Sequence, residues 1–248
     1  MYFRISVNKK FLLYLGIAIT WFPALSQSDN SISAILEARE QLVRKNHENL
    51  YISHVLTGKK YDMKYIGSIN SQFFRDRYTS YGTLVYDGVY FDKIEIQLDI
   101  YQEKVVVLLE SKNNEQFVTI DTEKVSELTF KDYKFVHIRH DSIMSDGLYQ
   151  HAFQGQHTDT YIKRTKLKKD KIENSKMIVE FLPSDKYYIK NNRGTFAITN
   201  KKSFLEAFQN SEKAATILKK NKVRFSKKKI EKGVLTAVPL LDPILVDN

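Results

Sequence analysis

The stretch that decides the fold is residues 83–109, which read TLVYDGVYFDKIEIQLDIYQEKVVVLL. Its Asp87-Gly88 pair separates two runs of β-forming residues. Such a pair favours a two-residue hairpin, because a type I′ turn needs positive φ at both central positions. Residues 94–100 then alternate strictly between apolar and polar side chains, and a β-branched run returns at 105–109. The stretch therefore predicts three successive antiparallel strands with one apolar face that another part of the chain must cover.

Strand patterns continue on both sides of this stretch. A turn at residues 57–60 separates two short predicted strands, and residues 68–81 have no clear period and predict a loop. Later hairpins are predicted around residues 154–156 and 191–194, where turn-forming residues interrupt the apolar pattern. Residues 164–176 are rich in lysine and lack an apolar period. We interpret them as an exposed loop or a ragged extension of a strand.

Helical spacing occurs at the two ends of the chain. Residues 31–45 place apolar side chains on one face and predict an N-terminal helix. Beyond the strands the period changes to 3.6, with Asn200, Ser211 and Ser226 as candidate N-caps of three helical runs, the last ended by Pro239. The sequence therefore predicts an α+β fold, mainly β: an antiparallel meander or curved sheet with one N-terminal helix and a small C-terminal helical cluster. We expect the helices at one end or the other to cover the apolar face of the meander.

The first 26 residues are organised like a secretory signal peptide. Three cations precede an apolar run at residues 11–22, and Ala24 and Ser26 supply small residues before the expected cleavage point. The run of twelve is shorter than the ~20 apolar residues that span a bilayer, so we expect cleavage and not anchoring. The expected organisation is a signal peptide (1–26) and one mature domain (27–248), which is mainly antiparallel β over 27–199 and a basic helical cluster over 200–248.

Composition sets further limits on the mature chain. No second apolar run approaches a spanning length, so we expect no transmembrane segment after cleavage. Export would carry the protein to the periplasm or the cell exterior. The chain has no cysteine, so an exported fold must be stable without disulfides.

Charge divides the chain into two unequal parts. Residues 27–162 hold 15 basic and 20 acidic residues, whereas residues 163–232 hold 21 basic and 7 acidic ones. The basic part indicates either a solvated face or a surface for an anionic partner: an envelope protein, an anionic lipid or a polysaccharide. Nucleic acid is not expected as the partner of an exported protein. The predicted contact residues are Lys163, Arg164, Lys166, Lys168, Lys169, Lys219, Lys220, Lys222, Arg224, Lys227, Lys228 and Lys229.

Catalytic and metal signatures are weak. The chain has no thiol and no G-x-S-x-G elbow, and the neighbouring His140, Asp141 and Ser142 do not by themselves define a triad. The six histidines do not supply three ligands at metal-binding spacing, and no Gly-rich loop is present to hold a phosphate. We therefore expect no cofactor. A carboxylate-based hydrolase remains an alternative, with candidate acids at Glu95, Asp99 and Glu110.

Several short motifs occur together in a particular order. These are TGKKY at 57–61, YDGVYFD at 86–92, LDIY at 98–101, GLY at 147–149, YIKR at 161–164, NKKS at 200–203 and KNKVRF at 220–225. In this order they resemble an uncharacterised group of secreted Bacteroidota proteins with no established activity, over roughly residue 50 to the end. The resemblance implies an envelope location and supplies no catalytic residues.

The function expected from these observations is that of an exported non-enzymatic envelope protein, a binding or accessory domain whose basic C-terminal half docks an anionic partner. Two alternatives stay open. One is the secreted hydrolase with a carboxylate-based site. The other is a carrier that holds an apolar ligand between a curved sheet and the helices.

Overall fold

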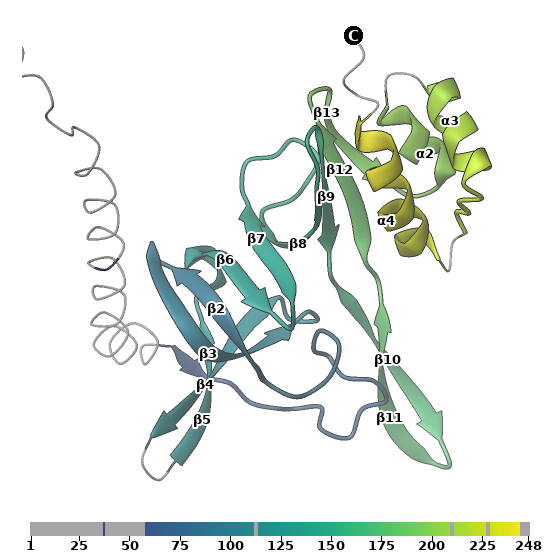
Figure 1. Cartoon of the computed structure of the whole chain (residues 1–248). Helices are drawn as coiled ribbons and strands as arrows, with labels where there is room; N and C mark the ends of the chain where they lie inside the picture. Colours follow the sequence, from purple (N-terminus) through teal and green to yellow (C-terminus); the bar gives the residue numbers. More distant parts are fainter. Residues whose placement is uncertain (1–36, 38–57, 112–113, 209–210, 227–228, 244–248) are drawn as a thin grey trace, which may run out of the picture. The chain divides into compact units, whose positions relative to one another are not determined.

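The computed structural model describes residue 37 and residues 58–111, 114–208, 211–226 and 229–243 (Figure 1). The chain divides into two compact units, Met1–Lys45 and Asn46–Asn248, and all contacts below lie within the second. The predicted signal peptide lies outside the described residues. The predicted N-terminal helix, apart from Glu37, also lies outside them. So does the first of the two short strands predicted on either side of the turn at residues 57–60.

Antiparallel β-structure dominates the described chain, as predicted. Eleven strands form one sheet in the order β1-β5-β4-β3-β2-β6-β7-β8-β9-β12-β13, and β10 and β11 pair separately. The strand bounds are β1 Lys59–Lys60, β2 Ser80–Tyr86, β3 Val89–Asp99, β4 Lys104–Ser111, β5 Asn114–Ile120, β6 Val125–Phe130, β7 Tyr133–Ile138, β8 Gly147–Gln154, β9 Thr158–Lys163, β10 Lys166–Glu173, β11 Lys176–Pro183, β12 Lys186–Asn191 and β13 Gly194–Ile198. A short 3₁₀ turn, η2, covers Thr122–Lys124.

The predicted meander is confirmed in β2, β3 and β4. Asp87 and Gly88 have φ of 50° and 78°, the positive values that a type I′ turn requires. The turn pairs Tyr86 with Val89, and β3 then pairs with β4 so that Ile96 lies opposite Val107.

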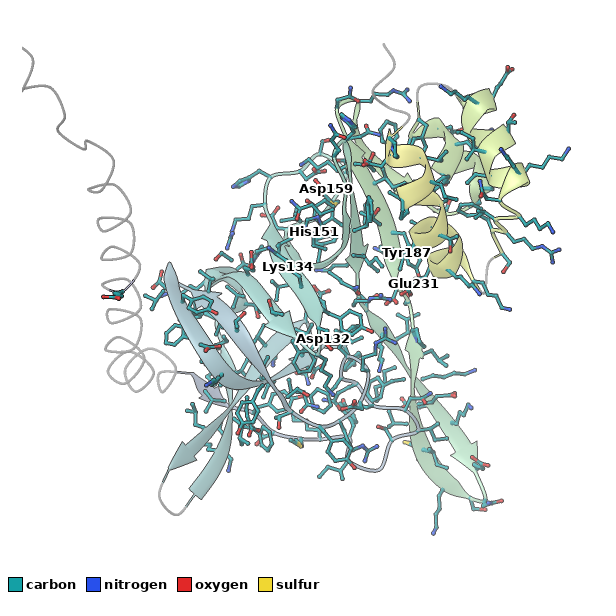
Figure 2. All side chains as sticks on the ribbon, viewed as in Figure 1. Asp132, Lys134, His151, Asp159, Tyr187 and Glu231 are labelled. Carbon is teal, nitrogen blue, oxygen red and sulfur yellow. The ribbon has the colours of Figure 1, made fainter. Side chains whose placement is uncertain are left out.

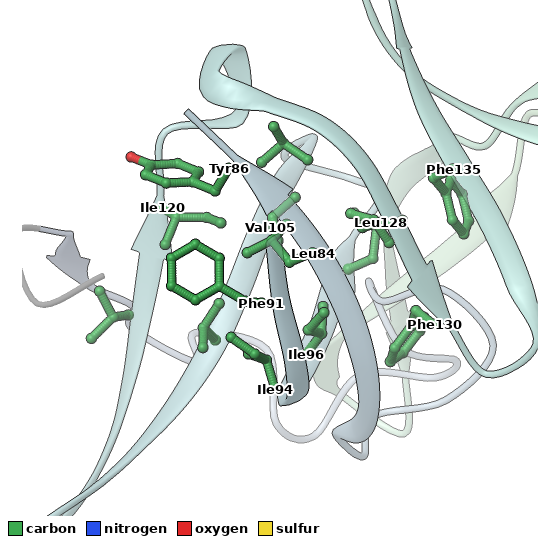
Figure 3. Close-up of a cluster of buried hydrophobic side chains, with 14 of the residues drawn as sticks. Leu84, Tyr86, Phe91, Ile94, Ile96, Val105, Ile120, Leu128, Phe130 and Phe135 are labelled. Carbon is green, nitrogen blue, oxygen red and sulfur yellow. The ribbon is translucent and has the colours of Figure 1, made fainter. Parts of the chain in front are cut away.

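Among the described residues, the apolar face of the meander is covered by the sheet itself and not by the C-terminal helices. The main core cluster joins buried side chains of β2 to β7 with Phe74 from the preceding loop (Figure 3). Phe74 meets Tyr133 and Phe135 edge-on, with ring centroids 5.1 and 5.2 Å away. No helical residue among those described belongs to this cluster, so the expectation that the C-terminal helices cover it is wrong.

The pairing of β2 with both of its neighbouring strands is irregular. Its pairing shifts register between Gly82 and Leu84 against β3, and again between Val85 and Tyr86 against β6. Register shifts of this kind bend a strand and increase its twist. A Cβ at Gly82 would lie 2.1 Å from the carbonyl oxygen of Thr129, so glycine permits the close approach of β2 to β6.

Three helices in the described C-terminal part of the chain cover the other end of the sheet. They are α2 (Lys201–Glu206), α3 (Ser211–Lys220) and α4 (Ile230–Leu241). Their buried side chains form a second core cluster with Ile189 of β12 and Ile198 of β13. This cluster places the helices, with their basic residues, over the last strands of the chain.

The helix caps follow the sequence only in part. Asn200 caps α2 through a capping box with Ser203, as predicted. Ser226 does not cap α4, which begins after Lys229 without a side-chain cap. Pro239 does not end α4 either, because the helix continues to Leu241, where Val238 and Leu241 are buried and the Asp242 N–H bonds the Val238 carbonyl.

Of the two interpretations of residues 164–176, an exposed loop or a ragged extension of a strand, the structure excludes the loop, because residues 166–173 form the regular strand β10. β10 pairs with β11 along its whole length, from Lys166 opposite Pro183 to Glu173 opposite Lys176. Asn174 and Ser175 form the turn with φ of 50° and 61°. Most of the hairpin's side chains are partly or fully exposed, which explains why the sequence shows no apolar period there. No helix in the described part of the chain is long and apolar enough to cross a membrane.

Candidate anion-binding site

The structure separates the predicted anion-binding residues into internal and exposed groups. Arg164, between β9 and β10, is only 8% exposed. Its guanidinium donates two hydrogen bonds to Glu231, at 2.7 and 2.8 Å, and one to Asp185 at 2.6 Å. Burial disfavours its charged form, but the hydrogen bond to Glu231 and the charges of Asp185 and Glu231 outweigh burial and raise the pKa of Arg164. Arg164 is therefore an internal tie between the sheet and α4.

Lys163 and Lys166 are also committed within the protein. Lys163 is 6% exposed, pairs with Glu103 at 2.6 Å and lies over the Tyr149 ring. The Lys166 ammonium donates to the carbonyl oxygens of Ser71 and Phe73, and burial lowers its pKa. Lys163 is thus held by an ion pair, and two of the three donors of Lys166 are occupied within the protein.

The lysines of β10 have a structural explanation. Lys168 pairs with Asp170 at 3.1 Å, and Lys171 pairs with Glu180 on β11 at 2.6 Å. Among the described residues, the outer edge of β10 has no strand partner, whereas β11 is joined to Ile69 on its other side. Lysines on a free edge hinder pairing with another chain, so Lys168, Lys169 and Lys171 protect this edge.

The exposed cations of the helical cluster form a groove. This open groove of about 480 Å³ is lined by Lys201 of α2, by Ala215, Thr216 and Lys219 of α3, and by Lys222, Val223 and Arg224 of the link that follows. We call it the basic groove. Its four cations are exposed, no acidic residue lines it, and the described contacts give none of the four an ion pair.

The end of α3 determines where the groove cations lie. The N–H of Val223 bonds the Leu218 carbonyl at 2.9 Å, and Lys222 has φ of 54°. This is the Schellman ending of a helix, in which the left-handed residue is usually glycine. A lysine at this position is conformationally unfavourable. The Lys222 side chain is thus kept beside Lys219 at a cost in backbone strain.

Two acidic residues of the last segment are occupied by contacts away from the basic groove. Residues 200–248 hold 11 basic and 5 acidic residues. Glu231 is bound to Arg164, and Asp242 accepts the backbone N–H groups of Gln156 and His157 at 2.7 and 3.0 Å. Because these two carboxylates are occupied elsewhere, they do not neutralise the basic groove.

Phe225, which lies among the cations in the sequence, belongs to the core. Its ring centroid lies 4.9 Å from that of Phe204 on α2. A Cβ at Gly233 of α4 would lie 2.9 Å from the Arg224 carbonyl and 3.1 Å from the Phe225 ring, so the link lies directly on α4. This packing fixes the backbone that carries Arg224 and leaves Phe225 unavailable for stacking on a base.

The remaining predicted contact residues fall outside the groove. Lys220 is exposed on α3 and Lys229 is exposed before α4, but neither lines it. Lys227 and Lys228 lie outside the described residues. Lys201 lines the groove although the sequence did not single it out. The sequence feature that could have indicated Lys201 is the Lys201-Lys202 pair at the start of α2. Lys201 comes near Lys219 only because α2 packs beside α3.

The residues considered for a catalytic triad have structural roles. Asp141 accepts hydrogen bonds from the N–H groups of Ile143 and Met144, from Thr195 and from Lys190. Burial acts to raise the pKa of Asp141, but these donors hold it well below its usual range. No described contact joins the Asp141 carboxylate to a side chain of its sequence neighbours.

Glu95 and Asp99, the two candidate acids with described side chains, each accept hydrogen bonds from other side chains. Glu95 accepts a hydrogen bond from Thr79 at 2.7 Å. Asp99 is fully buried and accepts from Tyr61 at 2.5 Å and from Gln72 at 3.1 Å. Burial first, and then the hydrogen bond to Asp99, raises the pKa of Tyr61. The side chain of Glu110 is not among those described.

The side chains of two described histidines contact neighbouring strands. His151 of β8 lies 2.8 Å from Asp159 of β9, and its ring stacks on Tyr161 (Figure 2). The Nδ1 atom of His137 lies 3.0 Å from the Val125 carbonyl. No group of three His, Asp or Glu side chains among the described residues has a metal-binding arrangement.

Comparison of the chain with protein-family models, with curated proteins and with solved structures finds no match.

Proposed function

We propose that this protein is an exported, non-enzymatic envelope protein whose C-terminal helical cluster docks an anionic partner through the basic groove. The observation that carries the proposal is the convergence of Lys201, Lys219, Lys222 and Arg224 on one groove that no acidic side chain lines. Cations gathered in a concave surface raise the local concentration of an anionic ligand. Export is supported by the signal-like N-terminal sequence.

The lining of the groove favours a polysaccharide over a lipid surface. Its only apolar side chains are Ala215 and Val223, which are too small to anchor the helices in a bilayer. An extended chain of carboxylated or sulfated sugars presents anions at intervals along one direction, which suits exposed, flexible cations. The proposed partner class is therefore an acidic polysaccharide.

The alternatives receive less support from the described cavities. A carrier of an apolar ligand needs an enclosed, mostly apolar cavity. Three cavities in the described part of the chain are lined by charged side chains, including Lys163 and Arg164 in one of about 150 Å³. No pair of facing carboxylates in the described contacts supports the hydrolase.

The test compares two variants that lose the same number of positive charges. One replaces the four groove cations Lys201, Lys219, Lys222 and Arg224 by Gln. The other replaces Lys168, Lys169, Lys171 and Lys176 of the β10–β11 hairpin by Gln. We expect immobilised heparin to retain the wild type and the hairpin variant, and to retain the groove variant much less. Equal loss in both variants would show that net charge, and not the groove, governs binding.

A further inference from the structure

A second cavity lies between the loop that precedes β2 and the β10–β11 hairpin. Its residues are remote in sequence from those of the basic groove. The second cavity measures about 450 Å³ and is lined by the loop residues Arg75, Asp76, Arg77 and Tyr78 together with Lys166 and Phe181. A volume of this size suits a small organic ligand. We propose that this cavity binds an acidic sugar, that is, a sugar ring carrying one carboxylate. The proposal does not depend on the basic groove.

Two guanidinium groups are held in place at the cavity. Arg75 donates from Nη2 to the Tyr133 hydroxyl at 2.5 Å and lies 4.8 Å from the Tyr133 ring centroid. Arg77 donates from Nη1 to the Ile66 carbonyl at 2.7 Å. Each guanidinium uses one of its five donors in these contacts, and the described contacts give neither one an ion pair. Guanidinium groups fixed in this way are suited to hydrogen bond a carboxylate.

The backbone at this loop is unusual. Arg75 has φ of 67°, a conformation that a non-glycine residue rarely adopts. A strained backbone conformation of this kind is kept only where the surrounding contacts hold it in place, and it is often found at ligand-binding positions. Here the neighbouring Phe74 is buried in the core while the Arg75 side chain is exposed at the cavity. The left-handed backbone at Arg75 thus directs its side chain to the cavity while the preceding Phe74 stays in the core.

Asp76 selects against ligands with more than one negative charge. Its Oδ1 atom accepts from Lys131 at 2.5 Å and from the Tyr78 N–H at 2.9 Å, whereas the described contacts give Oδ2 no donor. Burial acts against the charged form, but these two donors keep the pKa of Asp76 below its usual value, so the carboxylate is ionised at neutral pH. It would repel a phosphate dianion and would accept hydrogen bonds from sugar hydroxyls.

Tyr78 supplies a surface for the ring of the ligand. Its side chain is 72% exposed, which is high for a large aromatic residue that lines a cavity. An aromatic ring offers a flat apolar face with a polar tip, and this combination suits the apolar face and hydroxyl rim of a sugar. Two of the three donors of the Lys166 ammonium are bound to the carbonyls of Ser71 and Phe73, so Lys166 can offer the ligand one donor at most. The main ligand contacts therefore fall to the two arginines, Asp76 and Tyr78.

Binding of glucuronate to the purified protein, measured by isothermal titration calorimetry, tests the inference. Glucose is the matched probe because it has a hydroxymethyl group in place of the carboxylate, and inorganic phosphate tests for a plain anion site. We expect saturable binding of glucuronate in the millimolar range. We expect the affinities for glucose and for phosphate to be lower than that for glucuronate by about tenfold or more.

Variants then locate the binding site. Arg77→Lys keeps the charge but removes the fork of donors, and Tyr78→Ala removes the ring. We expect each to weaken glucuronate binding about fivefold or more. Arg224→Lys in the basic groove and Tyr90→Ala, whose side chain is 41% exposed, are the matched controls and should leave it unchanged.

Several results would overturn the inference. These are a lack of saturable glucuronate binding, binding of glucose or phosphate as tight as that of glucuronate, and unchanged affinity in both cavity variants. Weaker binding in Arg224→Lys with no change in Arg77→Lys would assign the sugar to the basic groove instead. If Arg77→Lys lost its folded circular dichroism spectrum, Tyr78→Ala alone would decide, because so exposed a side chain contributes little to folding.

Discussion

Arg164 and Glu231 are joined by two hydrogen bonds, from Nη1 to Oε2 at 2.8 Å and from Nη2 to Oε1 at 2.7 Å. The pair connects the segment after β9 to the first turn of α4, and Tyr187 of β12 lies beside it (Figure 2). The helical cluster is thus fixed to the sheet by a charge that the sequence had suggested for a partner.

Replacing Glu231 tests this tie. Glu231→Gln removes one charge, eliminates one of the two hydrogen bonds from a buried guanidinium, because the amide NH2 cannot accept, and weakens the other. Because Glu231 is itself 34% exposed on its side chain, we expect the free energy of unfolding to fall by about 1–3 kcal/mol and not by the full amount typical of a fully buried pair. Urea denaturation measures the change. Glu212→Gln, on the exposed face of α3, is the matched control and should change stability by less than about 0.5 kcal/mol.

The contribution of Glu231 also depends on pH. Its hydrogen bond to Arg164 lowers the pKa of Glu231 below the usual 4.5, although burial opposes the shift. A carboxylate with a depressed folded pKa stabilises the fold above its unfolded pKa and loses this contribution as pH falls through the folded value. The stability gap between wild type and Glu231→Gln should therefore be full at neutral pH and shrink progressively below pH 4.5. A gap that stayed constant into strong acid would contradict the ion pair.

Lys222 offers a prediction that separates stability from binding. Lys222→Gly relieves the left-handed strain at the end of α3, so we expect stability to rise by about 0.5–1 kcal/mol while heparin binding weakens. Lys219→Gly, three residues earlier inside the helix, should weaken binding and lower stability by about 1 kcal/mol. Thermal unfolding and heparin titration of both variants measure the two effects. Loss of stability in Lys222→Gly would contradict the assigned helix ending.

Gly82 tests the curvature of the meander. Gly82→Ala would place a Cβ 2.1 Å from the Thr129 carbonyl oxygen, so β2 and β6 must separate. We expect a loss of about 2 kcal/mol or more in the free energy of unfolding. Gly67→Ala is the control, because a Cβ there meets nothing within 4 Å and Gly67 does not have a positive φ. Equal urea midpoints for the two variants would show that β2 and β6 do not need this close approach.

The edge of β10 gives a prediction about solubility. Replacing Lys168, Lys169 and Lys171 by Thr keeps strand propensity but removes the charges from the unpaired edge. We expect faster aggregation on incubation at high protein concentration, followed by light scattering. The same replacement of Lys219, Lys220 and Lys222 on the helical cluster should have a smaller effect. The reverse order would contradict the protective role of the β10 lysines.

The strands were predictable where side chains alternate between core and solvent. Ile94, Ile96 and Leu98 specified β3, and the Asp87-Gly88 turn specified its pairing with β2. The sequence left β10 undecided between a loop and a strand extension, because its side chains are mostly exposed and burial imposes no period on the sequence. α4 continued past Pro239 because the buried Val238 and Leu241 outweigh one missing hydrogen bond.

The candidate site was predictable only as composition. The sequence showed the excess of cations in residues 163–232. It did not show that Arg164 is buried and Arg224 is exposed, because the two have similar sequence neighbours. Arg164 is buried because β9 and α4 bring Asp185 and Glu231 to it, and Arg224 is exposed because Phe225 occupies the core beside it. These contacts join residues distant in the sequence, so spacing alone could not reveal them.

The salt dependence of binding tests the basic groove most directly. The dissociation constant for a size-defined heparin oligosaccharide is measured from about 0.05 to 0.5 M NaCl, where the screening length falls severalfold. For the wild type and the hairpin variant we predict a steep rise of the constant with salt. For the variant with Gln at positions 201, 219, 222 and 224 we predict weak binding and a much flatter dependence. The same affinity and the same salt slope in all three proteins would contradict the groove as the anion-binding site.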